Sequence, residues 1–113
     1  MKVVTAIIKP FKLNDVRDAL NALGISGLTV TQVQGFGRQR GQGAVYRGPE
    51  YEVKFIPKLK VEVLVPAESA LKLFETLLSA VHTGQMGDGK VYVMEIEQAA
   101  RIRTGERDNQ ALS

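Results

Sequence analysis

Apolar residues recur with two different periods along this chain, and the shorter period predicts four strands. Val3–Ile8 is a continuous, largely β-branched run, which indicates a buried strand. Leu28–Gln34 reads as a second strand. The clearest alternation of apolar and polar residues lies between Leu59 and Val65, where Pro66 ends it. A fourth strand is expected at Val91–Ile96.

The longer period predicts two helices between these strands. The first is expected from Asn14 to Leu23, where Gly24 is a natural stop. Its apolar stripe consists of Leu13, Val16, Leu20 and Leu23. The second helix is marked by Leu71, Phe74, Leu77, Leu78 and Val81.

The resulting order βαββαβ is typical of an α+β, ferredoxin-like sandwich, with both helices on one face of the sheet. The other face also needs a cover, because the last strand is apolar on both sides: Tyr92, Met94 and Ile96 on one, Val91 and Val93 on the other. The simplest cover is a second copy of the same chain, so a homo-oligomer is expected.

The segment Gly35–Phe55 interrupts this pattern with five glycines, three arginines and two tyrosines. Long loops in small domains are usually functional or disordered, so we predict an exposed, flexible functional loop at about residues 37–55. The polar tail at about 106–113 is expected to be mobile. The 113 residues otherwise suit a single domain, 1–113.

Composition narrows the possible chemistry. The chain has no cysteine, which excludes disulfides and thiolate metal sites. Pro10 interrupts the N-terminal apolar run too early for a signal peptide or a spanning helix, so a soluble, intracellular protein is expected. The net charge of +3 suits anionic partners, although a basic solvated surface would give the same value.

Two basic motifs are candidates for phosphate binding. The turn Gly84–Lys90 can form a nest of backbone N–H groups with a lysine beside it, although an ordinary turn remains an alternative. In an extended segment, Arg101 and Arg103 would point the same way, with Ile102 packing on the opposite side. If these groups lie close together, they make a polyphosphate site. The alternative is a solvated basic end of the chain.

The start of the long loop is a third candidate. Gly35 and Gly37 would permit close approach of a ligand to the backbone, and Arg38 is a further phosphate donor. The Gln39 side-chain carbonyl is a suitable ligand for Mg²⁺. Simple loop flexibility would explain the same glycines.

Catalysis finds little support in the sequence. His82 is the only histidine, and no serine lies in a nucleophile elbow. Tyr51, between two glutamates in the loop, is an accessible acceptor for modification. A ferredoxin-like RNA-binding module is disfavoured because only 6% of residues are aromatic, and an enzyme acting on phosphorylated metabolites would need an acid–base pair.

Five sequence blocks together resemble the P-II signal-transduction proteins of bacterial nitrogen regulation, over essentially the whole chain. In order they are AIIKPFKL, GLTVTQVQGFGRQRG, YRGPEY, TGQMGDGKVYV and RIRTGE. The resemblance implies a homotrimer that binds ATP or ADP and, with Mg-ATP, 2-oxoglutarate, in clefts between subunits. Such a protein is a regulatory sensor of nitrogen, carbon and energy rather than an enzyme.

The resemblance also implies roles for individual residues. The nucleotide-binding set would be Thr29, Gly35, Arg38, Glu62, Gly87, Asp88, Gly89, Lys90, Arg101 and Arg103. The 2-oxoglutarate set would be Gln39, Lys58 and Gly87, with Gln39 also a ligand of Mg²⁺.

The long loop would be the T-loop of the family. Tyr51 matches the position that is uridylylated or adenylylated by a nucleotidyltransferase, and Arg47 matches a partner-contact position. Expected partners are an ammonium transporter and enzymes of nitrogen metabolism, with no nucleic acid. The location would be cytoplasmic, with recruitment to the inner membrane by a transporter. Gln85, Pro49 and Lys54 depart from the usual pattern, and these departures bear on the choice of partner more than on the ligand pocket. A divergent nucleotide sensor with another effector or partner is the alternative.

Overall fold

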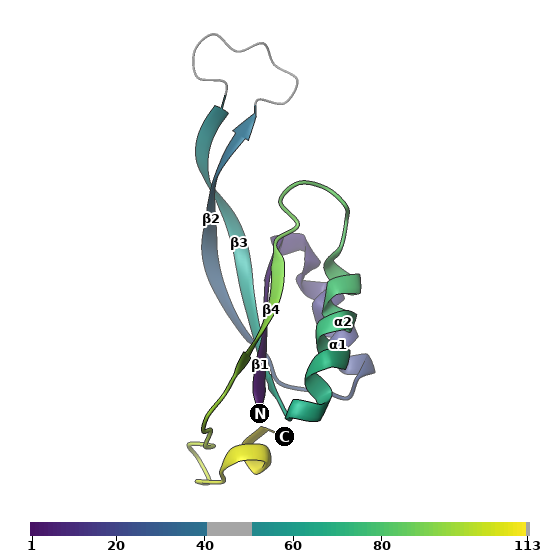
Figure 1. Cartoon of the computed structure of the whole chain (residues 1–113), viewed down its shortest axis with the longest axis vertical. Helices are drawn as coiled ribbons and strands as arrows, with labels where there is room; N and C mark the ends of the chain where they lie inside the picture. The colour runs from purple at the N-terminus through teal and green to yellow at the C-terminus, as the bar shows by residue number, and fades with distance from the viewer. Residues whose placement is uncertain (41–50, 113) are drawn as a thin grey trace.

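The computed structural model describes residues 1–40 and 51–112, with the side chains at 37–40 and 51–54 left aside. Its strands are β1 (Lys2–Ile8), β2 (Thr29–Arg40), β3 (Tyr51–Val65) and β4 (Lys90–Glu95), and its helices are α1 (Leu13–Ala22) and α2 (Ala70–Val81). Three short 3₁₀ helices are η1 (Pro10–Lys12), η2 (Ala67–Ser69) and η3 (Asp108–Leu112). The strands form one antiparallel sheet in the order β2-β3-β1-β4, with both helices against one face (Figure 1). The predicted α+β, ferredoxin-like architecture is confirmed.

Strand β1 lies in the middle of the sheet, between β3 and β4. Its alternate residues Val4, Ala6 and Ile8 are fully buried under the helices. They pack in register with Val61 and Val63 of β3. The apolar alternation in the sequence therefore sets the side of the sheet on which the core forms.

The two helices confirm the predicted periodicity, but only α1 presents the predicted residues. Val16 and Leu20 are buried, with Leu13 and Leu23 packed beside them. In α2 the buried stripe is Ala70, Leu73, Leu77 and Val81, with Phe74 half-buried. Leu71 and Leu78, two of the residues that marked this helix in the sequence, lie outside the buried stripe and are 71% and 45% exposed. The buried face of α2 is defined by Ala70 and Leu73 together with Leu77 and Val81. Because these residues occupy one side of the helix, the other leucines point toward solvent.

The face of the sheet opposite the helices is partly apolar and uncovered in the single chain. Tyr92 and Met94 of β4 are 40% and 55% exposed, and Leu64 of β3 is also exposed. They surround Val3 and Thr5 of β1, which their neighbours in the sheet bury. The expected homo-oligomer remains a prediction that this face supports.

The hairpin β2–β3 is longer than the sequence pattern indicated. Pairing continues from Thr29↔Glu62 as far as Arg40↔Tyr51, so the predicted loop boundaries of about 37–55 were too wide. The outer end of β2 is rich in glycine and arginine, and the sequence pattern did not identify it or the outer end of β3 as strand. The Phe36 and Phe55 rings nevertheless lie 5.0 Å apart on the two neighbouring strands. Proline has no backbone N–H to donate to a neighbouring strand. Pro57 is tolerated in β3 because the pairing of β3 with β1 begins only at Leu59, so β1 requires no hydrogen bond from position 57. The middle of the predicted loop lies outside the described residues.

The polar C-terminal segment is folded, although the sequence predicted mobility. The Asp108 amide donates to the Ala99 carbonyl at 2.8 Å, and Ala100 bridges Arg107. Helix η3 follows at the same end of the molecule as the N-terminus (Figure 1). Backbone hydrogen bonds order this segment without a large apolar face, which is why hydropathy did not reveal it.

Candidate functional site

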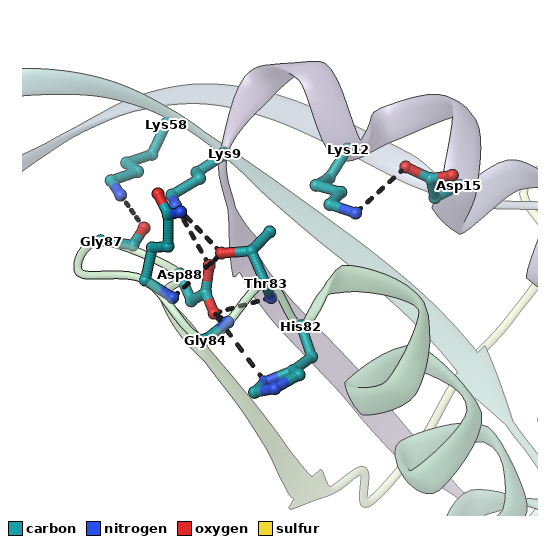
Figure 2. A network of polar contacts seen from close by, with 10 residues as sticks. Lys9, Lys12, Asp15, Lys58, His82, Thr83, Gly84, Gly87 and Asp88 are labelled. Atoms are coloured by element: carbon teal, nitrogen blue, oxygen red, sulfur yellow. Dashed lines mark hydrogen bonds and ion pairs between the residues drawn. The ribbon is translucent and has the colours of Figure 1, made fainter.

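The loop between α2 and β4 is closed on itself by the Asp88 carboxylate (Figure 2). Asp88 Oδ2 accepts hydrogen bonds from the backbone amides of Thr83 and Gly84, both at 2.9 Å. Asp88 Oδ1 accepts the Thr83 hydroxyl and lies 3.1 Å from Lys9 Nζ. The same lysine donates to Thr83 Oγ1 at 3.3 Å, so the loop is anchored to the end of β1.

These contacts make Asp88 a strong acid. The hydrogen bonds from the Thr83 side chain and backbone are the main reason that the pKa of Asp88 lies well below its usual value of 3.8. Desolvation opposes them, and the hydrogen bonds from Lys9 and Gly84 lower the pKa by smaller amounts. The carboxylate is therefore charged at every physiological pH. Because the folded-state pKa is lowered, its stabilising effect is present above pH 3.8 and is lost as the pH falls below it.

Three glycines give the loop a backbone that other residues would rarely adopt. Gly84, Gly87 and Gly89 have φ angles of +81°, +90° and +97°. A Cβ on Gly89 would lie 1.8 Å from the Ile7 carbonyl oxygen, so the chain passes directly against β1 at this point. Lys90 then begins β4 and pairs with Ile7. This conformation fits the predicted anion nest.

Lys58 connects this loop to the base of the long hairpin. Its ammonium group donates to the Gly87 carbonyl oxygen, as Figure 2 shows. A Cβ on Gly35, in the adjacent strand β2, would lie 3.4 Å from Lys58 Cγ. The end of β1, the base of the hairpin and the glycine loop therefore converge, and three of the predicted positions, Gly35, Lys58 and Gly87, lie side by side.

Thr29 and Glu62 meet at a second place in the molecule. They are register partners on the uncovered side of the sheet. A cleft of about 500 Å³ opens there, lined by Thr29, Glu62, Leu28, Leu64 and the C-terminal residues Ala111 and Leu112, among others. Its mixed apolar and polar walls suit a small organic ligand such as a nucleoside.

The arginine pair does not have the predicted geometry. Residues 102–104 form a turn closed by the Gly105 amide, which donates to the Arg101 carbonyl at 2.7 Å, so the segment is not extended. Ile102 is fully exposed and does not pack opposite the arginines. Arg101 Nε lies 3.2 Å from a Glu106 carboxylate oxygen, and its Nη2 lies 3.4 Å from the Gln110 carbonyl. The prediction failed because a turn, and not a strand, follows β4.

Arg101 and Arg103 are also remote from the glycine loop within one chain. Lys90 begins β4 beside that loop, whereas the arginines follow the opposite end of the strand (Figure 1). The described part of a single chain therefore does not assemble the predicted polyphosphate site.

For other predicted site residues, the structure describes only the backbone or does not describe the residue. Arg38 and Gln39 lie in β2 and Tyr51 begins β3, but their side chains are not described. Arg47 lies outside the described residues. Within the described ranges, no group of three or more acidic or histidine side chains could hold a metal, and no helix is long and apolar enough to cross a membrane.

Lys9 and Thr83 are members of the site that sequence reasoning missed. The available signal was an aspartate that follows a Thr-Gly pair at the end of a helix, since such side chains commonly close turns onto backbone amides. Together the loop, Lys58 and Lys90 can bind an anion, whereas the charge of Lys9 is paired with Asp88. His82 Nδ1 lies 3.9 Å from Asp88, which is too far for a hydrogen bond and gives no acid–base pair.

Comparison with known proteins agrees with this arrangement. The family model "Nitrogen regulatory protein P-II" matches residues 1–106. A nitrogen regulatory protein P-II from Rhizobium etli is 56% identical over 112 residues, which is 99% of this chain and all of the relative. Nitrogen regulatory protein GlnK from Escherichia coli is 53% identical with the same coverage.

A solved structure is also similar in fold. The crystal structure of Arabidopsis thaliana PII bound to citrate superposes with a TM-score of 0.79 at 34% identity. The match covers 97% of this chain and 90% of that one. The named relatives are regulatory proteins rather than enzymes, in agreement with the sequence analysis. The chain therefore belongs to the nitrogen regulatory protein P-II family.

Proposed function

We propose that this protein is a trimeric sensor that binds ATP or ADP and 2-oxoglutarate and regulates partners in nitrogen metabolism through its long hairpin. One observation carries the proposal. The glycine loop is bonded through Lys58 to the base of that hairpin, so a ligand on the loop would affect how the hairpin is held. An occupied site would select among hairpin conformations, and each conformation suits a different partner.

The nucleotide would lie across two surfaces. Backbone amides from Gly87 to Gly89, with Lys90, would bind the phosphates, and Arg38 would add a donor at the base of the hairpin. The nucleoside would occupy the Thr29–Glu62 cleft, which is large enough for it. Gly35 would permit close approach between these surfaces.

A second copy of the chain would complete this site. Arg101 and Arg103 lie at the far end of β4 from the glycine loop, so we propose that they reach the phosphates bound by a neighbouring subunit. The exposed apolar face around Tyr92 and Met94 gives that neighbour a surface to pack against. A closed homotrimer would then carry three equivalent sites.

The second effector would bind at the base of the hairpin. Lys58 would pair with a carboxylate of 2-oxoglutarate, the Gly87 backbone would lie against it, and Gln39 would bind Mg²⁺. The Arabidopsis relative is described with bound citrate, which is also a carboxylate ligand. This supports carboxylate effectors as a class.

The distal part of the hairpin would carry the output. Arg47 would contact partners such as an ammonium transporter in the inner membrane, from a cytoplasmic pool of the protein. A nucleotidyltransferase would modify Tyr51, adding bulk and negative charge that oppose docking. If Tyr51→Phe were still labelled by the cognate enzyme, the modification site would lie elsewhere.

Calorimetric titration tests the effector order. Binding of 2-oxoglutarate is expected only with Mg-ATP present, and Arg103→Ala is expected to weaken ATP binding steeply. Retained ATP binding without any 2-oxoglutarate response would favour the alternative of a divergent sensor with another effector. No ATP binding by the wild type would contradict the proposal as a whole.

Mixing of subunits tests whether sites are shared. Lys90→Ala and Arg103→Ala are each expected to lose ATP binding as pure proteins. Random trimers of the two would regain about one quarter of the sites if each site combines a loop and an arginine from different subunits. Sites contained within one chain would regain none, because every chain carries one of the substitutions.

A further inference from the structure

Asp88 has no acceptor capacity left for a ligand in the closed loop. An ionised carboxylate offers about four acceptor positions. Four donor groups occupy them here: the Thr83 amide, the Gly84 amide, the Thr83 hydroxyl and the Lys9 ammonium. A carboxylate cannot donate a hydrogen bond to phosphate and would repel it. The side chain is therefore poorly suited to touch the nucleotide.

The same four contacts hold the loop in the shape that an anion needs. They join its first residues, Thr83 and Gly84, to Asp88, which lies between the left-handed glycines Gly87 and Gly89. Lys9 fastens this closed ring to the end of β1, and its side chain is largely buried. The close passage of Gly89 against the Ile7 carbonyl is a second attachment to the same strand. The loop is thus attached to β1 at two points, through the Lys9 side chain and through the backbone at Gly89.

We propose that Lys9, Thr83 and Asp88 form a positioning clamp that pre-organises the glycine loop, and that the Asp88 carboxylate is not itself a ligand of nucleotide or metal. The inference rests on the proposed nucleotide-binding function of that loop. Pre-organisation strengthens binding because less conformational freedom is lost when the ligand arrives. The positive charge of Lys9 is likewise committed to the clamp, which leaves Lys58 and Lys90 as the described lysines beside the loop for anion binding.

Three substitutions separate a clamp from a ligand. Asp88→Asn keeps the size of the side chain but removes its charge, Thr83→Val removes the hydroxyl, and Thr83→Ser keeps it. We expect Asp88→Asn and Thr83→Val to weaken ATP binding about tenfold, equally with and without Mg²⁺, and Thr83→Ser to retain wild-type affinity. Asp15→Asn, which removes the Lys12–Asp15 pair of Figure 2, is the matched control and leaves ATP binding unchanged.

Hydrogen exchange on the ligand-free protein distinguishes the two roles, because the loss of a direct ligand contact would not change the exchange rates of the empty loop. Amides from Gly84 to Gly87 are expected to exchange faster in Asp88→Asn and Thr83→Val, and at the wild-type rate in Asp15→Asn. The stability difference between wild type and Asp88→Asn should be constant above about pH 5 and shrink below pH 3.8, where Asp88 in the unfolded chain becomes protonated.

Each outcome decides between the possibilities. A loss of affinity confined to Mg-ATP would make Asp88 part of a metal site and overturn the clamp. Unchanged amide exchange, or ATP binding by Asp88→Asn equal to that of the wild type, would also overturn it. If the wild type did not bind ATP, the proposed function would be rejected. The exchange rates of the ligand-free loop would still show whether Asp88 and Thr83 hold the loop in place.

Discussion

The two faces of the sheet are built for different neighbours. The face under the helices is made of Val4, Ala6 and Ile8 with their partners in β3, and it is closed from water within one chain. The opposite face mixes Tyr92, Met94 and Leu64 with polar residues, and it is left uncovered. The first face therefore stabilises the single chain, while the second is open to the neighbouring copy that we propose.

The largest expected effect separates core from surface on a single helix. Leu77 of α2 is fully buried and Leu78 is 45% exposed. Leu77→Ala should lower the free energy of unfolding by about 2–5 kcal/mol, because it leaves a cavity beneath the sheet. Leu78→Ala should cost about 1 kcal/mol or less. Denaturant titration of both variants tests this, and equal losses would mean that the core lies elsewhere.

A second substitution tests the uncovered face. Met94→Lys should convert the assembly to folded monomers, because a charge there prevents close packing of a neighbour. Leu71→Lys is the matched control, since Leu71 is even more exposed but lies on the outer side of α2. Analytical ultracentrifugation reports the mass and circular dichroism reports the fold. Intact oligomers in Met94→Lys, or monomers in Leu71→Lys, would place the interface on another surface.

The smallest expected effect concerns the hairpin beyond the helices. Phe36 and Phe55 continue the alternation of the helix-covered face, yet both are exposed because no helix reaches them. Phe55→Leu should cost about 0.5–1.5 kcal/mol through loss of the ring contact. Faster hydrogen exchange in the flanking strands would show that the pair supports the hairpin. An effect as large as that of Leu77→Ala would mean that the pair belongs to the core.

Sequence patterns predicted the fold well where burial controls structure. Alternation placed β1 and the inner part of β3 correctly, and the helical stripe identified α1, because these residues face a dry core. Hydropathy patterns did not predict segments that are held by hydrogen bonds without burial of apolar side chains. The outer part of the β2–β3 ladder, the folded C-terminal segment and the turn at Ile102 all depend on backbone contacts that hydropathy does not record.

The site shows the same division. The glycine loop and Lys58 were expected together from the family resemblance, and the structure brings them together. The remoteness of Arg101 and Arg103 could not be predicted, since it depends on the direction of the chain after β4. Lys9 was missed because its contact with Thr83 joins residues that are 74 positions apart. Thr83 was missed although its partner Asp88 is only five positions away.

The central position of β1 also has a consequence for synthesis of the chain. β1 leaves the ribosome before both of its partners, which are residues 59–65 and 90–95. Until both have been made, a nascent chain carries an apolar segment with two unpaired edges, which is the kind of segment that aggregates or binds chaperones. The central position that buries β1 in the folded protein therefore leaves this strand unpaired until most of the chain has been translated.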